Sequence, residues 1–293
     1  MNIFLTGASG FVGSEFLKYV KDKKVFIFTL GNSKIKSHNI KNCRGRLNNK
    51  FNNELAKCSS LLHLASAGVN DKNISYKELY KTNVSDSLKL FKSAAENNCL
   101  SWVVAGSSSE YGRTSLKKKK LNKEDLAIPI SNYAKTKYIF TKKIILLAKK
   151  KKAKLRIMRL FPLYGQAEKK HRLYSTAVNL SKKNKDIILY NGNEIRDYLD
   201  VKIAVKIIYQ SLNFKIKKPK KFFYQIWHVA SGKSSTIKSF VKKIYKKFLS
   251  KGKIIMKTRD NKLEDNLHHC SDIRSIWCCL KNKKHIRTIN QNL

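Results

Sequence analysis

Short apolar runs alternate with longer stretches of helical periodicity through the first two-thirds of the chain. The runs have the length of buried strands. The longest helical stretches cover residues 76–97 and 132–151. Strands that alternate with helices in this way form βαβ units with right-handed crossovers. We therefore predict an α/β fold built on a doubly wound parallel sheet, with strands at residues 3–5, 24–29, 59–65, 101–107 and 155–161.

The pattern becomes more mixed after about residue 165. A helix near residues 173–183 is followed by short strands near 187–190 and 223–228 and by further helices. This mixture indicates a smaller α/β lobe over the ends of the strands, where ligands bind in open parallel sheets. We predict a main domain at residues 1–165 and a C-terminal lobe at 166–293, with residues of about 196–215 returning to the main domain.

The first strand runs directly into three glycines spaced GxxGxxG, at Gly7, Gly10 and Gly13, and apolar residues then repeat at helical spacing. A strand, a glycine turn and a helix form the context that a dinucleotide site needs. The first glycine permits the turn, the second lets backbone amides approach a pyrophosphate, and the third lets the helix pack on the sheet. The helix N-terminus adds its positive dipole end. The alternative is a tight turn in an ordinary α/β protein.

The charge balance is extreme for a chain of 293 residues. Lys and Arg total 63 against 19 Asp and Glu, which gives a formal net charge of +44. Such a charge can indicate a nucleic-acid partner. The lysines are spread along the chain, however, with short clusters only at residues 117–120, 149–152 and 215–221. We interpret the charge as a compositional bias on solvated faces, with nucleic-acid binding as the alternative.

Other sequence features narrow the class of protein. No apolar run approaches the roughly 20 residues of a membrane span, and the N-terminal apolar stretch is cut by the glycine turn rather than forming a signal peptide. The six cysteines have neither CxxC nor zinc-ligand spacing, and we predict no metal site. We expect a cytoplasmic protein with reduced, mostly buried thiols.

Two later segments bring catalytic side-chain types to the same edge of the sheet. The strand at 101–107 ends in Ser107, and the helix at 132–151 carries Tyr133 and Lys137. Residues four apart share one helix face. A lysine ammonium near a phenol lowers the phenol's pKa and makes it usable as an acid or base near neutral pH. With a serine hydroxyl on the same substrate oxygen, this trio suits proton transfer at a carbinol while hydride passes to or from a nicotinamide.

Five motifs occur in the order typical of one family. They are TGASGFVG at residues 6–13, HLAS at 63–66, SSSEYG at 107–112, YAKTK at 133–137 and RDYLDV at 196–201. In this the chain resembles the extended short-chain dehydrogenase/reductases, specifically the nucleotide-sugar epimerase/dehydratase/reductase superfamily. The resemblance covers nearly the whole length. It implies a Rossmann-type NAD(P)-binding domain, a substrate-binding C-terminal lobe, a nucleotide-sugar substrate and a homodimer formed through helices 76–97 and 132–151.

The resemblance also implies roles for individual residues. Tyr133 would be the general acid/base, Lys137 would bind the nicotinamide ribose and tune Tyr133, and Ser107 would complete the triad. Arg196 and Arg259 would bind the substrate diphosphate, a geometry that suits guanidinium groups. A surface ion pair of Arg196 with a neighbouring carboxylate is the alternative. Ser108 and Ser109 complete the expected substrate contacts, and the expected cofactor contacts are Gly7, Ser9, Gly10, Phe11, Val12, Gly13, Thr29, Arg46, Leu64, Ala65, Asn83 and Lys137.

Departures from the family pattern narrow the expected reaction. Ser108 and Ser109 stand where dehydratases of the family often carry Asp-Glu, which disfavours dehydration. Pro162 stands where the family usually has Asn, so a backbone donor is lost there. The tail at 277–280 lacks the expected Gly-Trp-x-Pro. An epimerase that retains its cofactor and a 4-keto reductase that consumes NAD(P)H both fit, as does, from a different class, a non-catalytic nucleotide- or RNA-binding relative.

The choice between NAD and NADP depends on the ends of the second and third strands. A carboxylate at the end of strand two normally holds the ribose hydroxyls of NAD. Thr29 occupies that position here, and Arg46 replaces the Asp of the family's usual Gly-Asp-Leu. With Lys34 and Lys36 nearby, the loss of two negative charges favours NADP, although lysine is common enough in this chain for chance to place them there.

Overall fold

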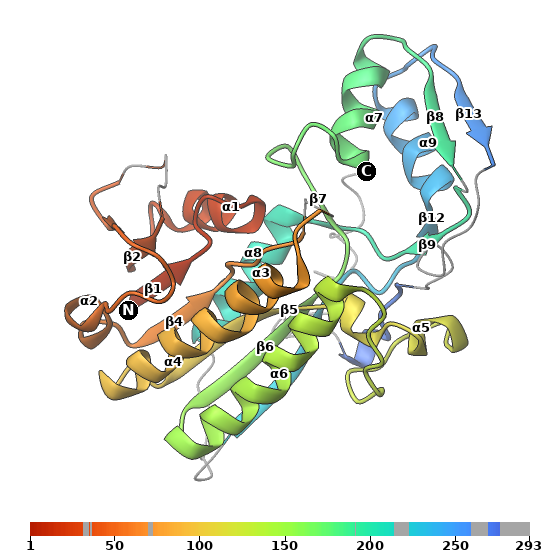
Figure 1. Ribbon diagram of the computed structural model, residues 1–293. Helices are drawn as coiled ribbons and strands as arrows, with labels where there is room; N and C mark the ends of the chain where they lie inside the picture. Colours follow the sequence, from red (N-terminus) through yellow and green to blue (C-terminus); the bar gives the residue numbers. More distant parts are fainter. Residues whose placement is uncertain are drawn as a thin grey trace.

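The computed structural model describes residues 1–31, 35, 37–69, 73–190, 192–213, 223–258 and 269–275. A seven-stranded sheet runs through the larger part of the molecule, and every neighbouring pair of its strands is parallel (Figure 1). Its spatial order is β11 (Phe223–Val229), β6 (Lys154–Leu160), β5 (Ser101–Ser107), β4 (Ser60–His63), β1 (Asn2–Thr6), β2 (Phe26–Leu30) and β3 (Ile40–Cys43). This order reverses direction between β1 and β4, which confirms the doubly wound parallel sheet.

Helices cover both faces of this sheet, because its central strands are apolar on both sides. Helices α1 (Phe11–Val20) and α8 (Val201–Asn213) pack on one face against a buried cluster that includes Ile3 and Leu5. Helices α4 (Ser87–Glu96) and α6 (Asn132–Lys151) cover the other face, where the rings of Phe91 and Trp102 lie 5.0 Å apart in an edge-to-face contact. A short helix, α2 (Asn52–Ala56), packs beside α4.

The helix predicted over 76–97 is continuous but contains a wide turn. It comprises α3 (Tyr76–Tyr80), a π-helical segment (Lys81–Asp86) and α4. Within this segment the Ser87 hydroxyl donates to the Thr82 carbonyl, five residues earlier. Such π-turns insert one extra residue and change the direction of the side chains around them. Here Asn83 and Val84 become buried.

The smaller lobe stands beside the carboxyl ends of the strands (Figure 1). Helices α7 (Leu173–Lys182) and α9 (Ile237–Lys247) pack on a two-stranded parallel sheet of β8 (Ile187–Tyr190) and β13 (Ile254–Lys257). Two short strand pairs, β7 (Leu163–Tyr164) with β10 (Leu199–Asp200) and β9 (Ile195–Arg196) with β12 (Ser235–Thr236), connect it to the main sheet. The chain also forms α5 (Thr114–Lys117) and short 3₁₀ turns at Ser108–Tyr111 and Ile273–Ser275.

Two segments beyond residue 165 belong with the main sheet. Helix α8 packs against α1, on one face of the main sheet. Strand β11 pairs with β6 over seven residues and forms the edge of the central sheet, so the assignment of residues 223–228 to the smaller lobe was wrong. Local periodicity could not place β11, because its partner lies about 70 residues earlier in the chain. Among the described residues, no helix has both the length and the apolar composition needed to cross a membrane.

Candidate functional site

The glycine turn after β1 fits the close approach of a phosphate. Gly7 has a φ of +77°, and a Cβ there would lie 2.6 Å from the backbone nitrogen of Ala65. A Cβ on Gly13 would lie 2.0 Å from the Gly7 carbonyl oxygen, so α1 can approach the turn only through a glycine. Gly10 is the N-cap of α1 and has no side chain to cap the first amides. These amides therefore face the cleft, as a pyrophosphate site requires.

Ser107 is the last residue of β5 and is held by Glu110. The Ser107 amide donates to Glu110 Oε1 at 2.8 Å, and the Ser107 hydroxyl accepts from the Ser109 amide at 3.2 Å. This reciprocal capping closes a 3₁₀ turn directly after the strand. The turn fixes the Ser107 side chain at the edge of the sheet, where it lines a cleft.

Tyr133 and Lys137 come from the first turns of α6, which begins behind the N-cap Ser131. The Ser107 and Ser66 side chains lie near enough to the Tyr133 phenol to lower its pKa. Lys137 is buried, and its Nζ donates to the Ala105 carbonyl at 2.7 Å. The predicted trio of Ser107, Tyr133 and Lys137 therefore lines one cleft.

Burial dominates the ionisation of this trio. It raises the pKa of Tyr133, and the hydrogen bonds from Ser107 and Ser66 act against that rise. It lowers the pKa of Lys137 to about 8, with Glu110 acting in the opposite direction. The predicted lowering of the Tyr133 pKa by Lys137 is not seen: the ammonium bonds to Ala105 in β5, and the phenol is bonded by serines. The arrangement keeps Tyr133 protonated, as a proton donor to an oxygen in the cleft must be.

Asn83 supports the site from behind. Its Oδ1 accepts from the Ala67 amide at 2.8 Å and the Ser66 hydroxyl at 3.2 Å, while its Nδ2 donates to the Ala67 carbonyl and to Thr136 Oγ1. The π-helical segment presents Asn83 to these partners. Asn83 thus joins the loop after β4 to α6, beside Tyr133, and it does not line the cleft itself.

One cleft of about 560 Å³ joins the glycine turn to the smaller lobe. Its walls come from the glycine turn, from the ends of β4 and β5, from α6 and from the loops after β6 and β7. It brings together most of the predicted site residues, namely Gly7, Ser9, Gly10, Phe11, Val12, Gly13, Leu64, Ser107, Ser108, Ser109, Tyr133, Lys137 and Arg196.

Arg196 lies on β9 and lines this cleft. The backbone at this point is held by its neighbour Asp197. The buried Asp197 carboxylate accepts from the Ser231 amide at 2.7 Å, the Gly232 amide at 2.9 Å and the Ser271 amide at 3.2 Å. Asp197 therefore ties together three segments that surround the cleft. The alternative of an ion pair between Arg196 and Asp197 is not supported, because this carboxylate bonds to the loops.

Arg172, Glu168 and His269 also line the cleft, although no sequence motif predicted them. Arg172 lies at the start of α7, with its Nε 3.7 Å from Glu168 Oε1. The Glu168 side chain is 9% exposed, and burial raises its pKa. His269 Nδ1 lies 3.1 Å from Ser108 Oγ. Of these three residues, only Arg172 could have been found from the sequence. Arginine is scarce beside lysine in this chain, and the same scarcity supported the assignment of Arg196 to the substrate diphosphate.

Other predicted contacts lie outside the cleft lining. Thr29 is fully buried in β2 and donates to Asn42 Oδ1 at 2.6 Å, and Arg46 is on the surface after β3. Ala65 adjoins Gly7 without lining the cleft. The cofactor roles of Thr29, Arg46 and Ala65 stay predictions. Arg259, Lys34 and Lys36, the tail at 277–280 and the basic cluster at 215–221 fall outside the described residues.

The chain is similar to known enzymes in both sequence and structure. Residues 3–226 match the model of the NAD dependent epimerase/dehydratase family. The structure of MoeE5 in complex with UDP-glucuronic acid and NAD is similar, with a TM-score of 0.80 and 19% identity over 99% of this chain and 92% of that one. UDP-N-acetylglucosamine 4-epimerase from Methanobrevibacter ruminantium M1 also has a TM-score of 0.80, with 21% identity over 93% and 89% of the two chains.

A dehydratase is among the similar structures as well. The dTDP-glucose 4,6-dehydratase of Bacillus anthracis, in complex with NAD, has a TM-score of 0.74 and 18% identity over 99% of this chain and 90% of that one. No curated protein matches the sequence. At these identities the solved structures establish the fold, while the family model covers about three-quarters of the chain. The chain is a member of the NAD dependent epimerase/dehydratase family.

Proposed function

We propose that this protein transfers hydride at C4 of a nucleotide-activated sugar, with Tyr133 as the general acid/base. The observation that carries the proposal is that Ser107, Tyr133 and Lys137 line one cleft together with the glycine turn. A sugar hydroxyl or ketone placed against these two groups would exchange a proton with Tyr133 and accept a hydrogen bond from Ser107. Structures similar in fold were solved with NAD and with UDP-sugars.

The glycine turn fits the pyrophosphate of NAD or NADP, because its glycines leave room that a Cβ would fill. The nicotinamide supplies the hydride acceptor or donor when bound. Lys137, whose ammonium lines the cleft, would then hold the nicotinamide ribose. The proposed preference for NADP rests on the loss of carboxylates at Thr29 and Arg46, and the similar structures were solved with NAD.

Arg196 is the proposed ligand of the substrate diphosphate, and Arg172 joins it on the lobe side of the same cleft. Two guanidinium groups that line one cleft suit a doubly charged diphosphate. Ser108 and Ser109 would face the sugar. The absence of carboxylates at these two positions supports an epimerase or a 4-keto reductase over a dehydratase. The dimer through α3, α4 and α6 stays part of the proposal.

The first test is the cofactor that the purified protein carries. Denaturation followed by chromatography of the released nucleotides is expected to give either NAD(H) in equal amount to protein or none. Stoichiometric NAD(H) supports an epimerase that regenerates its cofactor and contradicts the NADP preference. A protein without nucleotide that then binds NADPH more tightly than NADH supports a reductase. Binding of neither contradicts the proposed function.

The second test removes the catalytic hydroxyl. Tyr133→Phe is expected to lower turnover of a nucleotide sugar at least about 100-fold, the usual contribution of a general acid/base. Tyr138→Phe is the matched control, because Tyr138 lies on the same helix outside the cleft. Full turnover in Tyr133→Phe would contradict the assignment. Nucleic-acid binding that both variants retain, without any turnover in the parent protein, would favour the non-catalytic alternative.

A further inference from the structure

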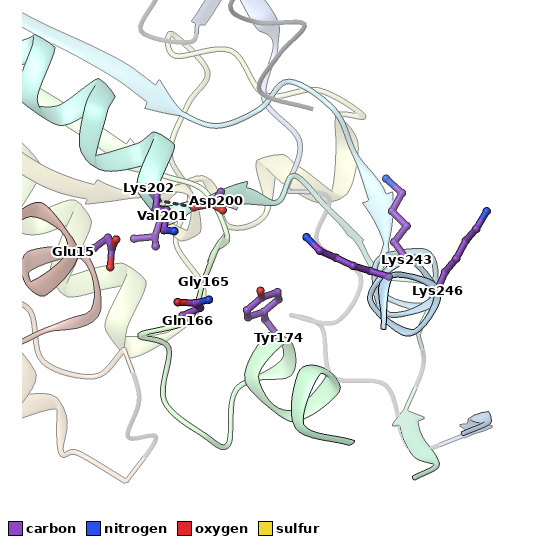
Figure 2. A pocket seen from close by; sticks show the side chains of 10 residues that line it. Glu15, Gly165, Gln166, Tyr174, Asp200, Val201, Lys202, Lys243 and Lys246 are labelled. Carbon is purple, nitrogen blue, oxygen red and sulfur yellow. Dashed lines mark hydrogen bonds between the residues drawn. The ribbon is translucent and has the colours of Figure 1, made fainter. Parts of the chain in front are cut away.

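A second and larger cleft lies between the two lobes. Its volume is about 870 Å³, and it opens on the side of α1 and α8 that faces α7 and α9. Figure 2 shows Glu15 and Val201 on one side, Lys243 and Lys246 on the other, and Tyr174 between them. The catalytic trio does not line it. The described residues that line it are Glu15, Gly165, Gln166, Tyr174, Asp200, Val201, Lys202, Lys243, Lys246 and Lys247.

One wall of this cleft is strongly basic. Lys243, Lys246 and Lys247 occupy one face of α9, because positions three and four apart are neighbours on a helix. The adjacent face of α9 is held in the lobe core by Phe240 and Ile244, so the helix that carries these exposed lysines is fixed in place. Among the described residues, neither Lys243 nor Lys246 has a carboxylate within the 4 Å of an ion pair. Like charges placed together without counterions favour the binding of an anion.

The carboxylates on the opposite wall are already engaged. Glu15 Oε2 accepts from Lys18 Nζ at 3.2 Å, and the Glu15 residue is 9% exposed. Asp200 Oδ1 accepts from the Lys202 amide at 2.7 Å, which caps the first turn of α8. Lys202 itself adds a fourth ammonium, from the side of α8. Four lysines against two carboxylates, of which Glu15 is paired with Lys18, leave a net positive charge for a ligand in this cleft.

The floor of the cleft offers neutral donors. In the described part of the chain the Tyr174 hydroxyl has no hydrogen-bond partner, and burial raises its pKa, so it keeps its proton. The exposed Gln166 amide lies beside it (Figure 2). Gln166 belongs to the loop of residues 165–172. The far side of this loop contributes Ala167, Glu168 and Arg172 to the catalytic cleft.

We propose that this second cleft binds a small phosphorylated anion, with Lys243 and Lys246 as its principal ligands and the Tyr174 hydroxyl as a donor. The 165–172 loop forms a wall of both clefts, so an occupant here would contact the segment that carries Arg172 into the catalytic cleft. The proposal does not depend on the sugar reaction. It requires only the lysines, the cleft between the lobes and the general affinity of clustered ammonium groups for phosphate.

Titration calorimetry with inorganic pyrophosphate tests the site on the full chain. Lys243→Gln with Lys246→Gln is expected to weaken binding by about tenfold or more, since hydrogen bonds to charged groups are the strong ones. Lys238→Gln with Lys242→Gln is the matched control: the same helix loses the same charge, but at exposed lysines that do not line the cleft. This control is expected to bind pyrophosphate as the parent protein does.

Two results would overturn the proposal. Equal weakening in both double variants would mean that pyrophosphate responds only to the overall charge of the chain. Unchanged binding in Lys243→Gln with Lys246→Gln would mean that pyrophosphate binds elsewhere, for example at Arg196. Tyr133→Phe separates this site from the proposed function, because that variant is expected to lose turnover and to retain the lysine-dependent binding.

Discussion

Glu110 and Arg159 form an ion pair beneath the edge of the sheet that lines the candidate site. Glu110 Oε2 lies 3.2 Å from Arg159 Nη2, and the two side chains are 0% and 4% exposed. The same carboxylate accepts from the Ser107 amide and from the Thr141 hydroxyl, and the guanidinium lies 4.4 Å from the centre of the Tyr111 ring. One buried carboxylate therefore links β5, β6 and α6 at Ser107, the proposed partner of Tyr133.

Glu110→Gln is expected to cost about 3–5 kcal/mol of unfolding free energy, because it leaves the Arg159 charge buried without a partner. Urea unfolding measures the change. The double variant Glu110→Gln with Arg159→Met is expected to be more stable than the single one, since it also removes the unpaired charge. A double variant that loses the sum of the two single effects would show that the pair acts through other contacts.

The sequence predicted the parts of the site that local pattern determines. The glycine turn, the helix that places Tyr133 four residues before Lys137, and the strand that ends at Ser107 each depend on neighbours in the chain. The Glu110–Arg159 pair joins residues 49 positions apart, and no spacing indicates it. The π-helical turn at Asn83 was also missed, because its side-chain pattern still has helical periodicity. Chain order likewise could not predict that Arg172 lines the same cleft as Arg196.

Lys137→Met is expected to abolish turnover and yet to stabilise the protein at pH 7. The folded pKa of Lys137 is about 8 against 10.5 for the free side chain, so burial of the ammonium costs about 3 kcal/mol below pH 8. The variant also loses the hydrogen bond to the Ala105 carbonyl, which reduces its gain in stability by about 1 kcal/mol. Lys135→Met, at an exposed lysine on the same helix, is the control and should change little.

The pH dependence of that difference checks the cause. Between pH 8 and 10.5 the unfolded chain binds the Lys137 proton and the folded chain does not, so the stability of the parent protein rises with pH in this window. The advantage of Lys137→Met should therefore shrink between pH 7 and 9.5 in urea unfolding. A difference that stays constant with pH would contradict the burial of a charged lysine.

Two buried histidines are expected to make the fold sensitive to acid. Burial lowers the pKa of His63 and of His228 to about 3. The His228 ring lies between the Tyr111 hydroxyl at 2.5 Å and the Ser271 hydroxyl at 2.7 Å. Below pH 6.5 the unfolded chain binds protons at these residues that the folded chain does not. Each histidine should therefore lower the unfolding free energy by about 1.4 kcal/mol per pH unit between pH 6 and 4.

Variants at a buried and an exposed histidine isolate this effect. His228→Gln is expected to be less stable at pH 7. Between pH 6 and 4 its unfolding free energy should change less steeply with pH, by about 1.4 kcal/mol per pH unit, because one titrating group is lost. His171→Gln changes an exposed histidine and should keep the parent slope. Urea unfolding at pH 4 to 7 measures both. Equal slopes in the parent protein and in His228→Gln would show that other groups cause the loss of stability in acid.

The two glycines that flank the start of α1 should separate folding from cofactor binding. A Cβ on Gly13 would meet the Gly7 carbonyl oxygen at 2.0 Å, so Gly13→Ala is expected to cost about 3 kcal/mol of stability. A Cβ on Gly10 would lie 3.2 Å from the same oxygen, and the residue is exposed in the cleft. Gly10→Ala should therefore cost less than about 1 kcal/mol and weaken dinucleotide binding, because its methyl group stands where the pyrophosphate must approach. Thermal unfolding and fluorescence titration with NADH and NADPH measure the two effects, and a Gly10→Ala variant with the affinity of the parent protein would place the pyrophosphate away from this turn.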